Sequence, residues 1–195
     1  RVAAGRLRRR GCLNGAGLRL MPTYDSNAIA GKATTGLTLT LASVIVSNQT
    51  NRYALGTTRI VEFGTTPVVT SVVRNGQSFT KTVHAADANH ESASHVLLAP
   101  NVTTADIVIS FASLLVCTAG FATYYDTLQA SAPVATFASG GLDTISNTVP
   151  SVTSSDLVAD AFWWDDSSAI TVGANQTQRL NTNFAGAGPS VGIST

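Results

Sequence analysis

Residues 68–84 read VVTSVVRNGQSFTKTVH and carry the strongest local signal in the chain. Two strand-like runs, VVTSVVR and QSFTKTV, meet at Asn75-Gly76. A two-residue type I′ turn needs positive φ at both central positions, which asparagine and glycine adopt at low cost. The stretch therefore predicts an antiparallel hairpin with its turn at Asn75 and Gly76.

A clear period of two appears earlier in the chain. Leu37, Leu39 and Leu41 alternate with Thr38 and Thr40, as a strand with one buried face requires. A sustained helical period with caps is not found, so parallel βαβ units are not expected. The predicted fold class is all-β, a two-sheet antiparallel β-sandwich. Residues 44–47 are read as an extension of the Leu37–Leu41 strand. Further strands are expected at residues 52–63, 68–74, 77–84, 95–99, 107–111, 114–125, 157–164 and 177–184, with a long connection at 136–155 that holds an edge strand at 149–152.

Composition restricts the class of protein further. The chain has 195 residues, of which 44% are hydrophobic and only 12% charged. It is too apolar for a disordered protein and too poor in charge for a coiled coil. This length suits one all-β domain, and such a core needs no disulfide framework or structural metal.

Charge is distributed unevenly along the chain. The first twenty residues hold six arginines and no acid, which leaves six bases against eleven acids in the remainder. Repeated arginine favours a basic arm that binds nucleic acid or an acidic protein surface, because arginine neutralises phosphate and releases its counterions. The alternative interpretation is a leader upstream of Met21. We therefore divide the chain into a basic N-terminal arm and linker (1–35) and a sandwich domain (36–195). The arm arginines are Arg1, Arg6, Arg8, Arg9, Arg10 and Arg19.

No segment of the sequence predicts a membrane anchor or a signal peptide. No run of 7 to 15 apolar residues follows the basic start, and none reaches the 18 or so that a spanning helix needs. We expect no membrane span.

The order of motifs is similar to that of a jelly-roll-like β-sandwich module found in bacterial secreted and surface proteins and in phage structural proteins. The segments that carry the resemblance are VTSVVRNGQSFTK, HVLLAPNVTTADIVISF, CTAGFATYYDTLQ, SSDLVADAFWW and GANQTQRLN. The resemblance implies a jelly-roll-like topology and a structural or surface role, with localisation in a virion, outside the cell or at the cell surface.

Two departures from this module matter. Residues 124–129 read YYDTLQ where the module usually has a different turn. The module also continues past the motif G-I-S-T into one more apolar strand, whereas this sequence stops at Thr195 of that motif. A sandwich without that strand would expose an open edge. We expect residues 22–35, or a strand of a neighbouring subunit, to fill it.

Metal binding is not expected. His84, His90 and His95 are read as a strand end, a polar loop and a strand start, without a second ligand set at zinc-like spacing. The loop from Asp87 alternates oxygen ligands but lacks glycine at position six and glutamate at position twelve, with Leu98 there instead, so it is no EF-hand. No metal and no cofactor is predicted.

Aromatic residues beside acids suggest a carbohydrate site. A strand places neighbouring residues on opposite faces, so one tryptophan of the adjacent pair should be exposed and could stack on a sugar ring. The alternative interpretation is plain core packing. The candidate residues are Trp163, Trp164, Asp165, Tyr124 and Tyr125.

Catalytic signatures are absent from the sequence. There is no G-x-S-x-G motif, no glycine-rich phosphate loop, and no serine linked to a histidine and an acid. Cys117 lies in an apolar run and reads as a buried small hydrophobe, while its pairing with Cys12 stays open. We expect no catalytic residues.

Three functions follow as hypotheses. The first is a non-enzymatic building block of a virion (phage tail, decoration or coat protein) or of a bacterial surface, which forms homo-oligomers or joins other structural subunits. The second is a carbohydrate-binding module whose partner is a polysaccharide. The third is a small viral capsid protein whose arm binds nucleic acid.

Overall fold

The computed structural model describes residues 2–7, 22–33, 36–61, 68–86, 90–112, 116–127, 134–135, 157–164, 174, 176–182 and 190–194. Within these ranges the chain forms strands and no helix. The strands are β1 (Val2–Leu7), β2 (Thr23–Ala33), β3 (Thr38–Ile45), β4 (Tyr53–Val61), β5 (Val69–Arg74), β6 (Gln77–Ser78), β7 (Thr80–Ala86), β8 (His90–Leu98), β9 (Thr104–Phe111), β10 (Val116–Tyr125), β11 (Val134–Ala135), β12 (Leu157–Trp164), β13 (Gln178–Thr182) and β14 (Ser190–Ser194).

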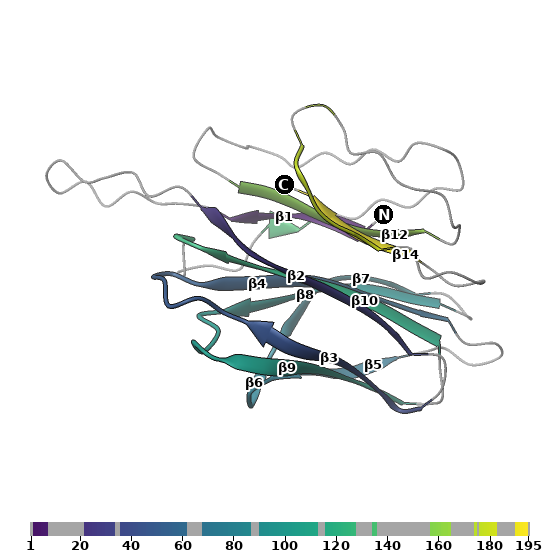
Figure 1. The fold of residues 1–195 in the computed structure, drawn as a ribbon. Helices are drawn as coiled ribbons and strands as arrows, with labels where there is room; N and C mark the ends of the chain where they lie inside the picture. The colour runs from purple at the N-terminus through teal and green to yellow at the C-terminus, as the bar shows by residue number, and fades with distance from the viewer. Residues whose placement is uncertain are drawn as a thin grey trace, which may run out of the picture.

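The strands form three stacked antiparallel sheets (Figure 1). The middle sheet has the order β2-β10-β4-β8-β7, and the lower sheet, β3-β9-β5-β6, packs on one of its faces. These two sheets are the predicted antiparallel β-sandwich, which is confirmed. The upper sheet, β11-β1-β12-β14-β13, lies on the opposite face of the middle sheet and was not predicted.

The connectivity of the sandwich is that of a jelly roll. Chain order from β2 to β5 crosses between the middle and lower sheets at each step, and β8, β9 and β10 do the same. The result is β2-β10-β4-β8 facing β3-β9-β5-β6, in which later strands insert between earlier ones. This interleaving of two Greek keys is the jelly-roll topology.

The hairpin predicted from Asn75-Gly76 is present, but its second strand is short. The strand expected at 77–84 divides into β6, which pairs with β5, and β7, which belongs to the middle sheet. Both turn residues have positive φ, 47° and 76°, as a type I′ turn requires. Arg74 pairs with Gln77 and joins β5 to β6 in the lower sheet. The alternation on β3 is confirmed for Leu39 and Leu41, which are buried while their threonine neighbours are exposed. Leu37 was expected on the same buried face, but it lies just before the strand and is 53% exposed.

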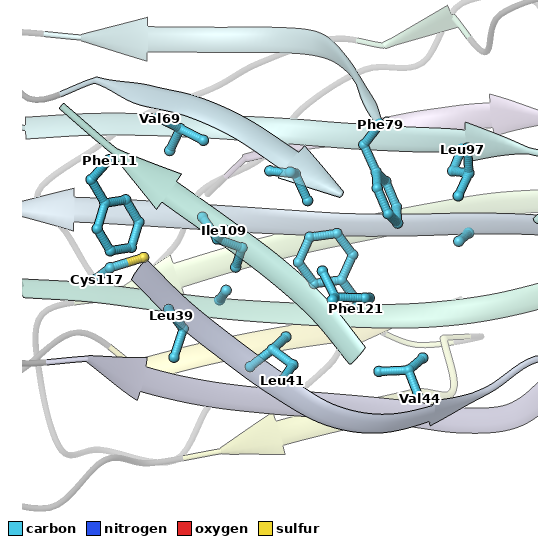
Figure 2. Close-up of a cluster of buried hydrophobic side chains, with 14 of the residues drawn as sticks. Leu39, Leu41, Val44, Val69, Phe79, Leu97, Ile109, Phe111, Cys117 and Phe121 are labelled. Atoms are coloured by element: carbon cyan, nitrogen blue, oxygen red, sulfur yellow. The ribbon is translucent and has the colours of Figure 1, made fainter. Parts of the chain in front are cut away.

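The main core lies between the middle and lower sheets (Figure 2). Phe121 of β10 packs edge-to-face on Phe79, with ring centroids 5.1 Å apart. Gly56 of β4 makes room for the Phe121 ring, because a Cβ at position 56 would lie 2.1 Å from its Cδ1. Leu41 and Ile109 close the core from the lower sheet.

The middle sheet is covered on both faces, which changes how its strands appear in the sequence. A second apolar cluster, which includes Tyr53, Leu55, Val96 and Tyr124, lies on the face away from the main core. The central strands β4, β8 and β10 are therefore buried along nearly their whole length. A strand buried on both faces loses the apolar-polar alternation.

This double burial overturns the prediction for the histidine segment. His90 was expected in a polar loop and His95 at a strand start, but β8 begins at His90 and runs through His95. His84 was expected to end its strand, whereas β7 continues to Ala86. Residues 90–95 read HESASH, a polar sequence that does not predict a buried strand. They form one because the small hydroxyl side chains among them fit between packed sheets.

The sandwich also includes residues that the sequence analysis assigned to the arm and linker. Residues 23–33 form β2, which pairs along β10 from Tyr125↔Thr23 to Cys117↔Ala33. Residues 22–35 were one of the two strands expected at an open edge. Residues 23–33 of this segment lie beside β10. Residues 2–7 form β1, between β11 and β12 of the upper sheet. The expected edge strand at 149–152 lies outside the described residues.

Candidate functional site

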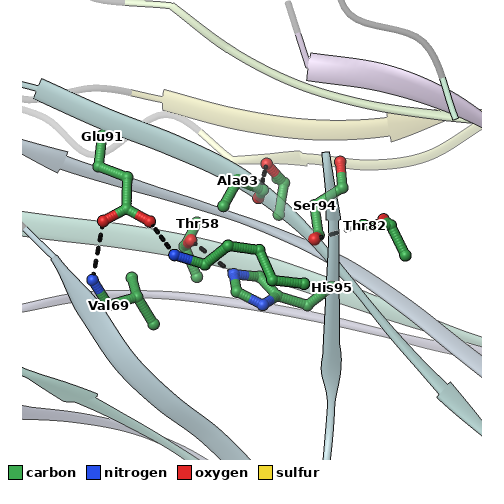
Figure 3. A network of polar contacts seen from close by, with 9 residues as sticks. Thr58, Val69, Thr82, Glu91, Ala93, Ser94 and His95 are labelled. Carbon is green, nitrogen blue, oxygen red and sulfur yellow. Dashed lines mark hydrogen bonds and ion pairs between the residues drawn. The ribbon is translucent and has the colours of Figure 1, made fainter. Parts of the chain in front are cut away.

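A cluster of buried polar side chains joins β4, β7 and β8 to the lower sheet (Figure 3). Glu91 of β8 is 1% exposed and forms an ion pair with Lys81 of β7. The other carboxylate oxygen of Glu91 accepts a hydrogen bond of 2.9 Å from the backbone N–H of Val69, the first residue of β5. Glu91 therefore ties the edge of the middle sheet to the lower sheet.

His95 lies beside this ion pair, directly opposite Lys81 in the pairing of β7 with β8. Its Nε2 and the hydroxyl of Thr58 share a hydrogen bond of 2.9 Å, and its ring lies 6.4 Å from that of Phe121. Its Nδ1 is buried with no hydrogen-bond partner. Burial, with a smaller effect of the Lys81 charge, lowers the pKa of His95 to about 3. The imidazole is neutral at physiological pH.

The chemistry of this cluster is structural. Both carboxylate oxygens of Glu91 are occupied, one by an ammonium group and one by a backbone amide. Among the described residues, no three histidine, cysteine or acidic side chains come together in a group that could hold a metal. The cluster fits the role of a polar connection inside an apolar core.

The neutral state of His95 predicts a pH dependence of stability. The pKa is about 3 in the folded chain and near 6.5 when unfolded, so between these values only the unfolded chain takes up the proton. Stability is therefore lost as pH falls from 6.5 towards 3, with a slope of up to about 1.4 kcal/mol per pH unit. Between pH 6.5 and 4.5 we expect the free energy of unfolding to fall by about 2 kcal/mol more in the native chain than in His95→Leu.

Urea unfolding at the two pH values measures this difference. His90→Gln is the control, because it removes a histidine of the same strand and leaves His95 in place. A loss of stability of equal size in the native chain and in His95→Leu would contradict the prediction.

Arg74 occupies a second buried polar position, at one end of the sandwich. Its side chain is fully buried, and its guanidinium donates to the backbone carbonyls of Val44, Asn101 and Thr103. Burial lowers the pKa of this guanidinium. Arg74 thus fastens the end of β3 to the connection between β8 and β9.

The outer face of the lower sheet is the third feature that bears on function. The strand registers align small outward-facing side chains in rows across the sheet. All of these side chains are exposed or partly exposed. We call this surface the hydroxyl face, and it consists of Thr38, Ser110 and Ser71 in one row and Thr40, Val108, Val73 and Ser78 in the next.

Charge is nearly absent from the outer face of the lower sheet. Its four strands hold two charged residues, Arg74 and Asp106. Arg74 is buried inside, and Asp106 accepts a hydrogen bond of 2.9 Å from the backbone N–H of Ser43. The two rows of the hydroxyl face hold no charged side chain, while Asp106 is exposed on the same outer side of β9, two residues from Val108. Sequence reasoning missed this surface, although the Thr38 and Thr40 alternation signals one of its strands.

The predicted carbohydrate residues do not all reach the surface. Tyr124 is 0% exposed, and its ring packs edge-to-face on Tyr24 with centroids 5.9 Å apart, so it cannot stack on a sugar. Tyr125 is partly buried at the end of β10. Trp163 and Trp164 are placed by backbone only, opposite strand β14, and Asp165 lies outside the described residues.

The predicted arm arginines are mostly outside the described part of the chain. Arg6 is placed by its backbone in β1, where it pairs with Val134 and Val158. The structure does not describe Arg1, Arg8, Arg9, Arg10 or Arg19.

Cys117 is a buried small side chain, as predicted. It is 0% exposed and carries a free thiol whose pKa is raised, first by burial and then by the charge of Glu91. A thiol of this kind is a poor nucleophile. Cys12 lies outside the described residues.

The part of the chain that the structure describes holds no helix of the length and hydropathy that a membrane span needs.

Comparison with known proteins adds no relative. No family model, no curated protein and no solved structure matches the chain.

Proposed function

We propose that this protein is a non-enzymatic structural subunit that assembles with further copies of itself into a virion or a surface layer. The observation that carries the proposal is the jelly-roll order of its sandwich, β2-β10-β4-β8 against β3-β9-β5-β6. Jelly rolls form viral capsid domains, and also lectins and cupins, so the choice among these depends on the side chains.

The side chains favour a building block. Inside the sandwich, Glu91, Lys81 and Arg74 are engaged in contacts that connect strands and loops. His95 shares a hydrogen bond with Thr58 and so belongs to the same internal network. A lectin role draws less support, because Tyr124 is buried.

The Arg-rich segment extends the proposal to nucleic acid. Arg8, Arg9 and Arg10 are consecutive in a stretch without acids. Contacts of this kind depend strongly on salt, because each neutralised phosphate releases counterions. A virion subunit would use the segment to hold its packaged nucleic acid.

Assembly is tested directly on the full chain. Light scattering and negative-stain electron microscopy at increasing concentration should show regular particles or layers. A protein that stays monomeric from about 1 to 100 μM, with and without nucleic acid, would overturn the proposal, since weak structural contacts already act in this range.

Nucleic-acid binding is tested separately by titrating salt. Replacing Arg8, Arg9 and Arg10 by glutamine should reduce the slope of log K against log salt by about 2 to 3, at 0.7 to 0.9 per lost phosphate contact. Arg179→Gln, a cation near Tyr24 on another part of the chain, is the control and should leave the slope within one contact of the native value. An unchanged slope in the triple variant would remove nucleic acid from the proposal and leave the assembly role.

A further inference from the structure

We infer that the upper sheet is a cover that opens from the jelly roll as one cooperative unit, while the middle and lower sheets stay folded. Opening uncovers the apolar side of the middle sheet that carries Tyr53, Leu55, Val96 and Tyr124. This motion is separate from the proposed assembly role and does not depend on it.

The course of the chain divides the molecule into these two parts. The jelly-roll strands, β2 to β10, follow one another from residue 23 to residue 125, and the upper-sheet strands come from residues 2–7 and 134–194. Strand pairing stays within each sheet, so no ladder between described strands joins the upper sheet to the middle one. Opening therefore breaks side-chain packing and leaves the ladders of both parts whole.

The side of the middle sheet that faces the upper sheet is apolar over only part of its area. Leu55, Val96 and Ala122 belong to the second apolar cluster on this side. Residues two and four positions away on the same strands point to the same side, because side chains alternate along a strand. These positions form what we call the polar half, and they hold Thr57, Arg59, Ser92, Ser94, Thr118 and Gly120, all buried.

Two hydroxyl groups of the polar half lack a hydrogen-bond partner among the described residues. They are Ser94 Oγ and Thr118 Oγ1, on side chains that are 2% and 1% exposed. A hydroxyl buried in this way has lost its hydrogen bonds to water without replacing them. Water reaches both groups once the upper sheet lifts. Their burial therefore raises the free energy of the closed state relative to the open one.

The jelly roll keeps its own contacts when the cover opens. Its main core lies on the other side of the middle sheet, against the lower sheet (Figure 1). The contacts of Glu91 with Lys81 and Val69, and those of Arg74, also lie within the jelly roll. Opening thus costs less free energy than global unfolding, as expected of a unit that unfolds or detaches by itself.

Hydrogen exchange of the full chain, measured by mass spectrometry at neutral pH, tests this opening. β12 and β4 are both inner strands, one in the upper and one in the middle sheet, so fraying of a sheet edge affects neither. We expect the amides of β12 to exchange roughly tenfold faster than those of β4, or more. Low concentrations of urea should accelerate the exchange of β12, with a smaller slope than that of β4, because opening exposes less surface than unfolding does.

Two results of this measurement would overturn the inference. Equal exchange in β12 and β4 would show that the upper sheet separates only when the whole chain unfolds. Exchange of β12 that does not respond to urea would report a local fluctuation of one strand rather than the opening of a sheet.

Thr118→Val tests the physical cause of the opening. Valine has nearly the same shape but no hydroxyl, so the closed state becomes more stable and the exchange of β12 should slow about fivefold or more. The matched control is Thr57→Val, the same substitution in the polar half, whose hydroxyl donates to the carbonyl of Ala93 at 3.2 Å. It should not slow the exchange of β12.

Exchange of β12 that is unchanged or faster in Thr118→Val would contradict the role given to the polar half and overturn the inference. If Thr118→Val fails to fold by circular dichroism, Ser94→Ala replaces it, because it removes the other unpartnered hydroxyl. The expected slowing and the control stay the same.

Discussion

Replacing Arg74 by leucine is expected to lower the free energy of unfolding by about 3 to 5 kcal/mol. The guanidinium donates to three backbone carbonyls, of Val44, Asn101 and Thr103. Leucine fills part of the volume but leaves the buried carbonyl of Val44 and the part-buried carbonyls of Asn101 and Thr103 without this donor, at about 1 to 3 kcal/mol for each group that water does not reach. Urea unfolding followed by tryptophan fluorescence measures the change.

Arg52 offers a matched control for this loss. It also donates to two backbone carbonyls, of Pro100 and Gln49, but it is only partly buried, so water can replace it. Arg52→Leu should cost about 1 kcal/mol. Equal losses of unfolding free energy in the two variants would show that burial does not increase the contribution of the Arg74 hydrogen bonds.

Replacing Lys81 by methionine is expected to cost about 2 to 4 kcal/mol, because it leaves the Glu91 carboxylate buried without its cation. Glu91 is 1% exposed, whereas the Lys81 side chain is 32% exposed. The acid therefore bears the larger penalty when its partner is lost. Thermal and urea unfolding at neutral pH test this expectation.

A double variant separates the ion pair from plain packing. Lys81→Met with Glu91→Gln removes both charges and keeps an acceptor for the N–H of Val69. It should recover about 1 to 2 kcal/mol relative to Lys81→Met alone. A double variant less stable than Lys81→Met would show that the cost comes from lost packing.

Several strands could be predicted because their cause is local. Asn75 and Gly76 set a turn that needs positive φ, and this need is independent of the rest of the chain. Leu39 and Leu41 alternate with exposed threonines because β3 has one buried and one exposed face. In both cases neighbours in sequence carry the whole signal.

The elements that were missed depend on distant contacts. A strand was predicted at 95–99, but the first half of β8, residues 90–94, reads as polar and was missed; it is part of the strand because sheets cover both of its faces. The polar cluster depends on the alignment of Lys81 with His95 and on the approach of Val69 from another sheet. Burial of Tyr124 follows from the upper sheet, whose strands come from both ends of the chain.

The sequence by itself determined the all-β class, the hairpin at residues 75–76 and the burial of Cys117, because short-range periodicity and turn geometry are local properties. Only the tertiary structure decided that a third sheet covers the sandwich, that Glu91 and Arg74 connect its parts, and that the outer face of the lower sheet carries little charge. These features require strands far apart in the chain to lie in register, and such a register depends on packing between sheets.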